Sequence, residues 1–325
     1  MKNQVRHLII LLLLATSICA QATVWRINPD PSSTAHFNSL NSAVSDASVV
    51  NGDILHLEGN QLYVASNPGS EYQGIVTKQL SLIGPGYFIA DNNASWAVEE
   101  ALCGVITMSA GSDGSSLQGL IIQQLIIQAD DITIQSCNIN TAQLNNALNS
   151  IFNGNYIHSD VPGLPAIMAS FSAGNLFSYN IIKSDFAVAS PQPVIQELGS
   201  SGSVYTHNVI ADGVSEVDDA AFSDNIFVNH TFDVIGICTL VNNLFDQFTS
   251  PIATFTPGGL PNDMFELQNP PNNNQTDVDM TLVIVGLPTS SPDTAFDIVP
   301  GGLADGTASD GTNIGVFQVG VDTYV

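Results

Sequence analysis

An asparagine flanked by apolar residues recurs six times in the middle of the chain, and no other feature constrains the fold as strongly. The recurring asparagines are Asn138, Asn155, Asn180, Asn208, Asn225 and Asn243. They follow one another at intervals of 17, 25, 28, 17 and 18 residues, which suits one coil of a β-solenoid. Each unit is too short to bury its own apolar side chains, so the units must stack. The repeat therefore predicts a stack of parallel strands.

The recurring asparagines are best explained as a structural ladder at a tight turn. Stacked parallel strands lie about 4.8 Å apart, so equivalent side chains of successive coils touch. Asparagine tolerates positive φ and can bond to the equivalent residue of the next coil. We therefore expect the six asparagines to form a turn ladder and not a catalytic row, with Val, Ile, Leu and Phe filling the interior.

Residues 1–22 have the pattern of a secretory signal peptide. A basic start at Lys2 and Arg6 precedes an apolar run from Leu8 to Ala15, and small residues follow. No later apolar run approaches about 18 residues, so no transmembrane anchor is expected. The sequence thus predicts a secreted protein, located outside the cell or at its surface. Its three remaining cysteines are an odd number, which excludes a complete disulfide framework and favours buried thiols.

The mature chain is strongly acidic. Losing Lys2 and Arg6 with the signal peptide lowers the formal net charge from −25 to −27, because only Arg26, Lys78 and Lys183 remain basic. Such a charge repels nucleic acid, anionic lipid and polyanionic sugars. Nucleic acid is therefore excluded as a partner, and a solvated acidic surface is the simplest explanation of the composition.

We expect a single domain over residues 23–325, with a cap at about 23–50, stacked coils at about 51–268 and a C-terminal closing segment at about 269–325. In the cap, Phe37, Leu40, Ala43 and Val44 recur at helical spacing. This spacing predicts an amphipathic helix with Thr34 as its N-cap. Such a helix would cover the open end of the stack, whose strand edges would otherwise invite aggregation.

Four segments resemble a known family. They are the expected helix followed by Gly52 and Asp53, and residues 78–88, 111–120 and 310–317. In these segments the chain resembles secreted right-handed parallel β-helix proteins of the pectin-lyase-like superfamily, particularly a subgroup common in Bacteroidetes. The resemblance spans residues 23 to 317 and implies an all-β, right-handed parallel β-helix with an N-terminal amphipathic capping helix. The superfamily includes lyases, hydrolases, esterases, adhesins and binding proteins, so the resemblance implies no single activity.

Four polar residues form the best catalytic candidate. If Asn155 and Asn180 occupy equivalent turns, His158 stacks on Lys183, and Asp160 and Asp185 stack two residues further on. Related lyases abstract a proton beside a uronate carboxylate with an Arg or Lys base, or with Ca²⁺ to neutralise the substrate. The Arg that such lyases commonly use is missing, and a solvated ion-pair patch beside a turn is the alternative.

An acidic segment further along the chain is the metal candidate. Glu216 and Asp218 would project from the same side of a strand, about 7 Å apart, which suits a pair of glycosidase carboxylates. Together with Asp219 they could also bind Ca²⁺, the one cofactor that the sequence suggests, through oxygen ligands. The alternative is an acidic turn in an already acidic protein.

These patterns favour an extracellular non-catalytic β-helix protein, either glycan-binding or structural and adhesive. The alternative is a carbohydrate-active enzyme, either a polysaccharide lyase or a glycoside hydrolase. The partner expected in both cases is a polysaccharide or cell-surface glycan. Sugar binding usually requires exposed aromatic rings, and Trp96 and Tyr179 are the candidates.

Overall fold

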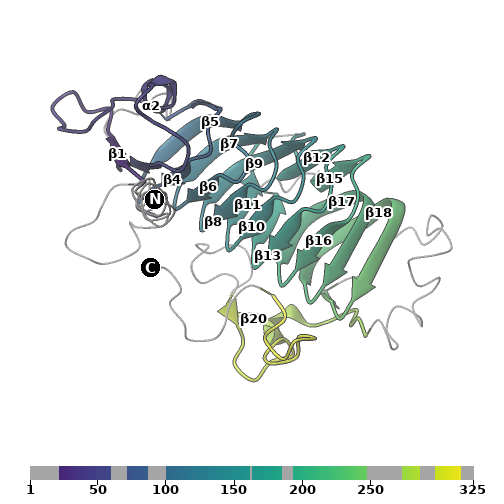
Figure 1. Ribbon diagram of the computed structural model, residues 1–325. Coiled ribbons are helices and arrows are strands. Elements are labelled where there is room, and N and C mark those ends of the chain that lie inside the picture. The colour runs from purple at the N-terminus through teal and green to yellow at the C-terminus, as the bar shows by residue number, and fades with distance from the viewer. Residues whose placement is uncertain are drawn as a thin grey trace, which may run out of the picture.

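The strands of the protein stack in parallel to form an elongated coil (Figure 1). The structure is a computed structural model that describes residues 22–59, 72–86, 100–161, 163–184, 193–246, 273–285 and 297–315. Among the described residues, nineteen strands form one continuous sheet. All strand pairs in this sheet are parallel, and the paired strands come from successive coils. The predicted all-β parallel β-helix is confirmed.

Each coil passes through three faces in a fixed order. The first face contains β3 (Gly74–Val76), β12 (Ile167–Ser170) and β15 (Pro193–Leu198). The second contains β1 (Val24–Ile27), β2 (Ile54–Leu57), β4 (Ser81–Ile83), β6 (Ser116–Gln118), β8 (Thr133–Gln135), β10 (Ile151–Asn153), β13 (Leu176–Ser178) and β16 (Ser203–Thr206). The third contains β11 (Tyr156–Ser159), β14 (Ile181–Ser184) and β19 (Leu244–Phe245).

Five longer strands bend from one face to the next. They are β5 (Leu102–Met108), β7 (Ile121–Ile127), β9 (Asn138–Asn145), β17 (Val209–Ser223) and β18 (Ile226–Val241). The first three of these strands begin on the third face and end on the first, and β17 and β18 continue onto the second. The three faces therefore enclose one interior.

Apolar side chains fill that interior in columns that run along the stack. Because side chains alternate along a strand, every second residue points inward. One column stacks Phe152, Phe177, Tyr205 and Phe222, with neighbouring ring centroids 4.7 Å apart. The Tyr205 hydroxyl donates a hydrogen bond of 2.8 Å to the buried Glu197 carboxylate. Burial of the Tyr205 ring, together with this carboxylate, raises the pKa of Tyr205 well above its ordinary value.

The three described cysteines lie in the interior as free thiols, as the sequence predicted. Burial raises the pKa of Cys137 to about 12 and that of Cys103 well above its ordinary value. Thiolates are the reactive form of cysteine, so these two side chains are chemically inert in the folded protein.

The N-terminal helix α2 is shorter than its sequence pattern suggested. It covers Leu40–Ser45, and its N-cap is Ser39, whose hydroxyl accepts a hydrogen bond from the Ser42 backbone N–H. Phe37 is excluded from the helix because its backbone forms a parallel bridge with Ile27, so Thr34 does not cap the helix. The buried side of α2 packs against β1 and β3. Its role as a cover for the end of the stack remains a prediction.

The C-terminal segment, residues 273–285 and 297–315, lies along the side of the stack (Figure 1). It contains the 3₁₀ helix η3 (Met280–Leu282) and the antiparallel pair β20 (Ile284–Val285) and β21 (Asp297–Ile298). Its apolar side chains include Met280, Val283, Ile298 and Ile314. These pack on an apolar column outside the third face, namely Tyr156, Ile181, Val209, Ile226 and Leu244. Within the described residues no helix is long and apolar enough to cross a membrane.

One buried carboxylate ties the start of the chain to the stack, and its protonation should be measurable. Asp53 accepts hydrogen bonds from the Thr23 and Val50 backbone N–H groups and from Trp25 Nε1, at 2.8, 2.9 and 2.8 Å. Burial alone would raise the pKa of Asp53, but these hydrogen bonds outweigh it and hold the pKa below 3.8. A carboxyl group whose pKa is lower in the folded than in the unfolded state stabilises the fold at pH values above its unfolded-state pKa. That stabilisation is lost as the pH falls through the folded-state pKa.

We therefore expect the environment of Trp25 to change as the pH falls below 3.8, the ordinary value of the carboxyl. An acid titration of tryptophan fluorescence in a Trp96→Phe background measures this change. Asp53→Asn should abolish the transition and lower the free energy of unfolding by about 1–3 kcal/mol, because two or more donors lose a charged acceptor. Asp279→Asn is the control, since Asp279 is an exposed helix cap that accepts from Thr281. An unchanged transition in Asp53→Asn would contradict the assignment.

Candidate functional site

The asparagine ladder occupies the corner between the second and third faces. From Asn180 onward, each Asn Oδ1 accepts hydrogen bonds of 2.8–3.0 Å from the backbone N–H and from the side-chain amide of the preceding ladder residue. The ladder residues are Asn155, Asn180, Asn208, Asn225, Asn243 and Asn274. Cys137, and not Asn138, stands one coil before Asn155, because the Cys137 N–H donates to Asn155 Oδ1 at 2.9 Å.

Positive φ at this corner belongs to the residue before each asparagine. These residues have φ between 51° and 63°, and they are Gly154, Tyr179, His207, Asp224, Asn242 and Asn273. The asparagines therefore contribute the amide bonds, while the left-handed turn is made by residues of very different chemistry. This differs from the expectation that asparagine itself would adopt the turn conformation.

The catalytic candidates lie partly together on the outer side of the third face. His158 pairs with Lys183 in the register of β11 and β14, as stacking of Asn155 on Asn180 requires. His158 Nε2 lies 3.1 Å from Asn138 Oδ1, and its ring stacks on Tyr156 with centroids 4.7 Å apart. Since an amide oxygen can only accept, Nε2 carries the imidazole proton in this arrangement.

A carboxylate and an amide complete this group. The exposed Asp160 accepts a hydrogen bond from Asn140 Nδ2, and the Asp160 backbone N–H donates to Asn140 Oδ1 at 3.1 Å. Asp185 lies outside the described residues. We call the set Asn138, Asn140, His158, Asp160 and Lys183 the third-face patch. It presents an imidazole, an ammonium, a carboxylate and two amides on adjacent coils.

Of the two aromatic candidates, Tyr179 is not part of this patch. Tyr179 occupies the ladder corner with a φ of 56°, and its ring stacks on His207 with centroids 4.9 Å apart. Trp96 lies outside the described residues.

The acidic candidates lie near the first face. Glu216 Oε2 accepts a hydrogen bond of 2.7 Å from Gln196 Nε2 of the preceding coil. Asp219 is exposed at the next corner, and a register irregularity in β17 separates it from Val217. The side chain of Asp218 lies outside the described part of the structure. Among the described side chains, no group of three or more His, Cys, Asp and Glu residues is arranged to bind a metal ion.

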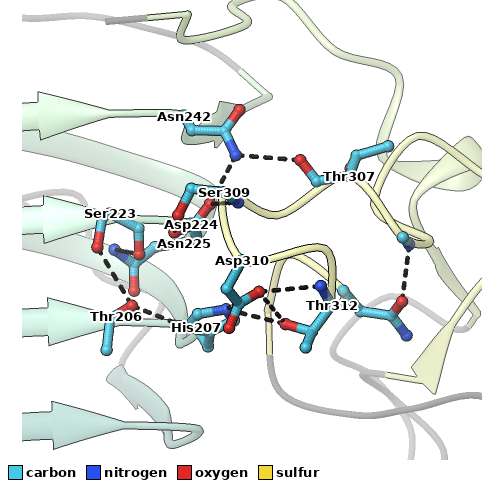
Figure 2. Close-up of polar contacts among 12 residues, drawn as sticks. Thr206, His207, Ser223, Asp224, Asn225, Asn242, Thr307, Ser309, Asp310 and Thr312 are labelled. Atoms are coloured by element: carbon cyan, nitrogen blue, oxygen red, sulfur yellow. Dashed lines mark hydrogen bonds and ion pairs between the residues drawn. The ribbon is translucent and has the colours of Figure 1, made fainter.

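A polar clasp, which the sequence did not indicate, fastens the C-terminal segment to the ladder corner (Figure 2). Asp224 is only 1% exposed. Its carboxylate accepts hydrogen bonds from the Ser309 backbone N–H at 2.8 Å and the Ser309 hydroxyl at 2.6 Å. Asn242 Nδ2 donates to Asp224 Oδ1 at 2.6 Å and to the Thr307 carbonyl at 3.1 Å. A buried carboxylate thus holds a loop 85 residues away in sequence.

His207 links the same loop through a directed chain of hydrogen bonds (Figure 2). The Thr312 hydroxyl donates to Asp310 Oδ1 at 2.6 Å, so it accepts from His207 Nε2 at 3.2 Å. His207 Nδ1 then accepts from the Thr206 hydroxyl at 2.8 Å. Hydrogen bonds from Thr312 hold the pKa of the Asp310 carboxyl below its ordinary value. With one ring nitrogen bonded to Thr312 and the other to Thr206, His207 serves as a connector within the fold.

No protein-family model matches the chain, and no curated protein matches it. Architecture and local geometry are therefore the basis for assigning a function.

Proposed function

We propose that the protein is an extracellular, non-catalytic β-helix protein that binds a glycan at the third-face patch. The observation that carries this proposal is the side-by-side placement of His158 and Lys183 in register, with Asn138, Asn140 and Asp160 around them. Hydroxyl groups of a sugar both donate and accept hydrogen bonds, so their recognition needs such a mixture of polar groups on a fixed scaffold.

Internal contacts hold the patch in place before any ligand arrives. Asn138 and Tyr156 fix the His158 ring, and Asn140 fixes Asp160. Side chains that are already ordered lose little conformational entropy on binding, which favours affinity. His158 Nε2 donates to Asn138 Oδ1, so this nitrogen is already engaged within the patch.

Charge restricts the class of glycan. A chain with a formal net charge of −25 repels polyanionic sugars, whereas a neutral glycan meets no such barrier. We therefore infer a neutral polysaccharide or a neutral cell-surface glycan as the ligand.

The test is a glycan array followed by titration calorimetry with the neutral glycans that bind. The double variant His158→Ala/Lys183→Ala should weaken binding at least tenfold. Gln118→Ala/Gln135→Ala is the matched control, because these two exposed residues are also register partners on adjacent coils, but on the second face. We expect this control to bind like the unaltered protein.

Two results would contradict the proposal. Release of reducing ends or unsaturated products, lost in the His158→Ala/Lys183→Ala variant, would establish a carbohydrate-active enzyme instead. Absence of glycan binding in the unaltered protein would leave a structural or adhesive role as the better account.

A further inference from the structure

We propose that an apolar ridge at the corner between the first and second faces is a docking surface for a basic, apolar polypeptide segment. The ridge consists of Leu148, Ile151, Phe171, Leu198 and Val204, which supply five of the 13 large apolar side chains that are exposed in the described structure. It lies on a different side of the coil from the third-face patch, so it is independent of the proposed glycan binding.

The ridge spans three successive coils. The Phe171 backbone N–H donates to the Leu198 carbonyl at 3.0 Å, which places these residues on adjacent coils. Leu176 lies on the middle coil and pairs in register with Ile151 of the coil before it and with Val204 of the coil after it. Leu148 forms a bridge with Ala173, two residues beyond Phe171. Neighbouring exposed apolar residues of this kind mark an interaction surface more often than scattered ones do.

Phe171 is exposed and is also held in a costly backbone conformation. Its side chain is 71% exposed, and its φ is +52°. Ser170 pairs with Asn145 and Leu198, so Asn146 and Gly199 are the equivalents of Phe171 in the adjacent coils. Both of those residue types tolerate positive φ, whereas for a bulky residue the left-handed region costs about 1–2 kcal/mol.

Packing within the chain does not explain this phenylalanine. A Cβ atom added to Gly199 would lie 2.9 Å from Phe171 Cε1, so the ring rests on the glycine of the next coil. That contact still leaves most of the ring in water. Strain at an exposed residue points to a function for its side chain, because stability alone would favour Asn or Gly here.

The charges around the ridge identify the partner. Asp130 and Asp131 lie one coil before it, where Asp130 Oδ1 accepts from the Leu148 N–H at 2.9 Å. Asp219 lies one coil after it, where its carbonyl accepts from the Gly202 N–H at 2.9 Å. Of the described basic residues, Arg26 is on β1, Lys78 bonds to carbonyls near α2 and Lys183 is on the third face.

An acidic rim around apolar side chains complements a partner that is basic and apolar. It also argues against a second copy of this chain as the occupant, since two strongly acidic surfaces repel each other. A sugar needs hydrogen-bonding side chains beside an aromatic ring, and no member of the ridge has a hydrogen-bonding side chain.

The test measures binding of a synthetic amphipathic Lys/Leu peptide by fluorescence anisotropy. Phe171→Asn should weaken binding at least tenfold and should leave the urea midpoint unchanged or higher, because asparagine suits the positive φ. Ile75→Asn is the matched control, since Ile75 is another exposed apolar residue on an earlier coil. A Lys/Ser peptide of equal charge should bind at least tenfold more weakly than the Lys/Leu peptide.

Several results would overturn the proposal. Among them are equal binding by Phe171→Asn and the unaltered protein, equal binding of the two peptides, or absence of binding. A lower urea midpoint in Phe171→Asn would show that the ring stabilises its own chain. Self-association that disappears in Phe171→Asn would assign the ridge to a second copy of the protein.

Discussion

Replacing Asn208 with alanine is expected to lower the free energy of unfolding by about 3 kcal/mol or more. Asn208 is fully buried, and its Oδ1 accepts from the Asn180 backbone N–H at 2.8 Å and from Asn180 Nδ2 at 3.0 Å. Its Nδ2 donates to the Phe177 carbonyl at 2.9 Å. Alanine removes the partner of the buried Asn180 backbone N–H, of the Phe177 carbonyl and of one Asn180 Nδ2 hydrogen, while Asn180 Nδ2 keeps its bond to the Phe152 carbonyl. Each buried group that is left unsatisfied costs about 1–3 kcal/mol. Urea unfolding followed by circular dichroism measures the loss.

Asn138→Ala is the control for this experiment. Asn138 shares the sequence pattern of the ladder, but it is half-buried and its Oδ1 faces His158. We expect its removal to cost less than about 1 kcal/mol, the typical net value of one hydrogen bond. Similar losses for the two variants would show that the ladder bonds do not carry the stability assigned to them.

Asp224→Ala should release the C-terminal segment from the stack. The variant removes a buried carboxylate that accepts from the Ser309 backbone, the Ser309 hydroxyl and Asn242. Hydrogen bonds to a charged group are worth about 1.5–3 kcal/mol each, so a loss of about 3 kcal/mol or more is expected. Release would also uncover the apolar column on the third face, which includes Ile181 and Ile226.

Hydrogen exchange measures this release directly. Amides of residues 307–315 should lose their protection in Asp224→Ala, and binding of a hydrophobic dye should rise. Asp305→Ala is the control in the same segment, because the Asp305 carboxylate accepts only a local bond, from the Gly301 N–H at 2.7 Å, among those described. Unchanged protection of residues 307–315 in Asp224→Ala would contradict the role given to the clasp.

The sequence predicts the coil well because its signal is local and repeated. Spacing of the asparagines correctly places His158 beside Lys183, since both positions are counted from the same turn. The same pattern fails at Asn138, which lies one residue before the inward Ile139, whereas Asn155 lies two residues before the inward Ile157. Side chains alternate along a strand, so an offset of one residue moves a side chain from the ladder to the outer surface.

The clasp could not be found in this way. His207, Asp224 and Asn242 have nothing in common in sequence except their place before a ladder asparagine. Asp224 and His207 bond to Ser309 and Thr312, which are 85 and 105 residues away, and Asn242 bonds to Thr307, which is 65 residues away. Contacts over such distances depend on how the C-terminal segment folds back, and no repeat pattern records that path. Phe171 could not be predicted for a different reason, because its strain and exposure follow from the folded structure and not from the residue type.

The ladder joins identical groups at every step, although its members are separated by 17 to 31 residues in the sequence. An asparagine in this corner meets the same neighbour whether the coil that follows is short or long. A gene that lost or duplicated one whole coil would therefore still encode a chain in which every ladder amide finds a partner. The length of the molecule is a quantity that evolution can change in steps of one coil, while the turns between coils change independently.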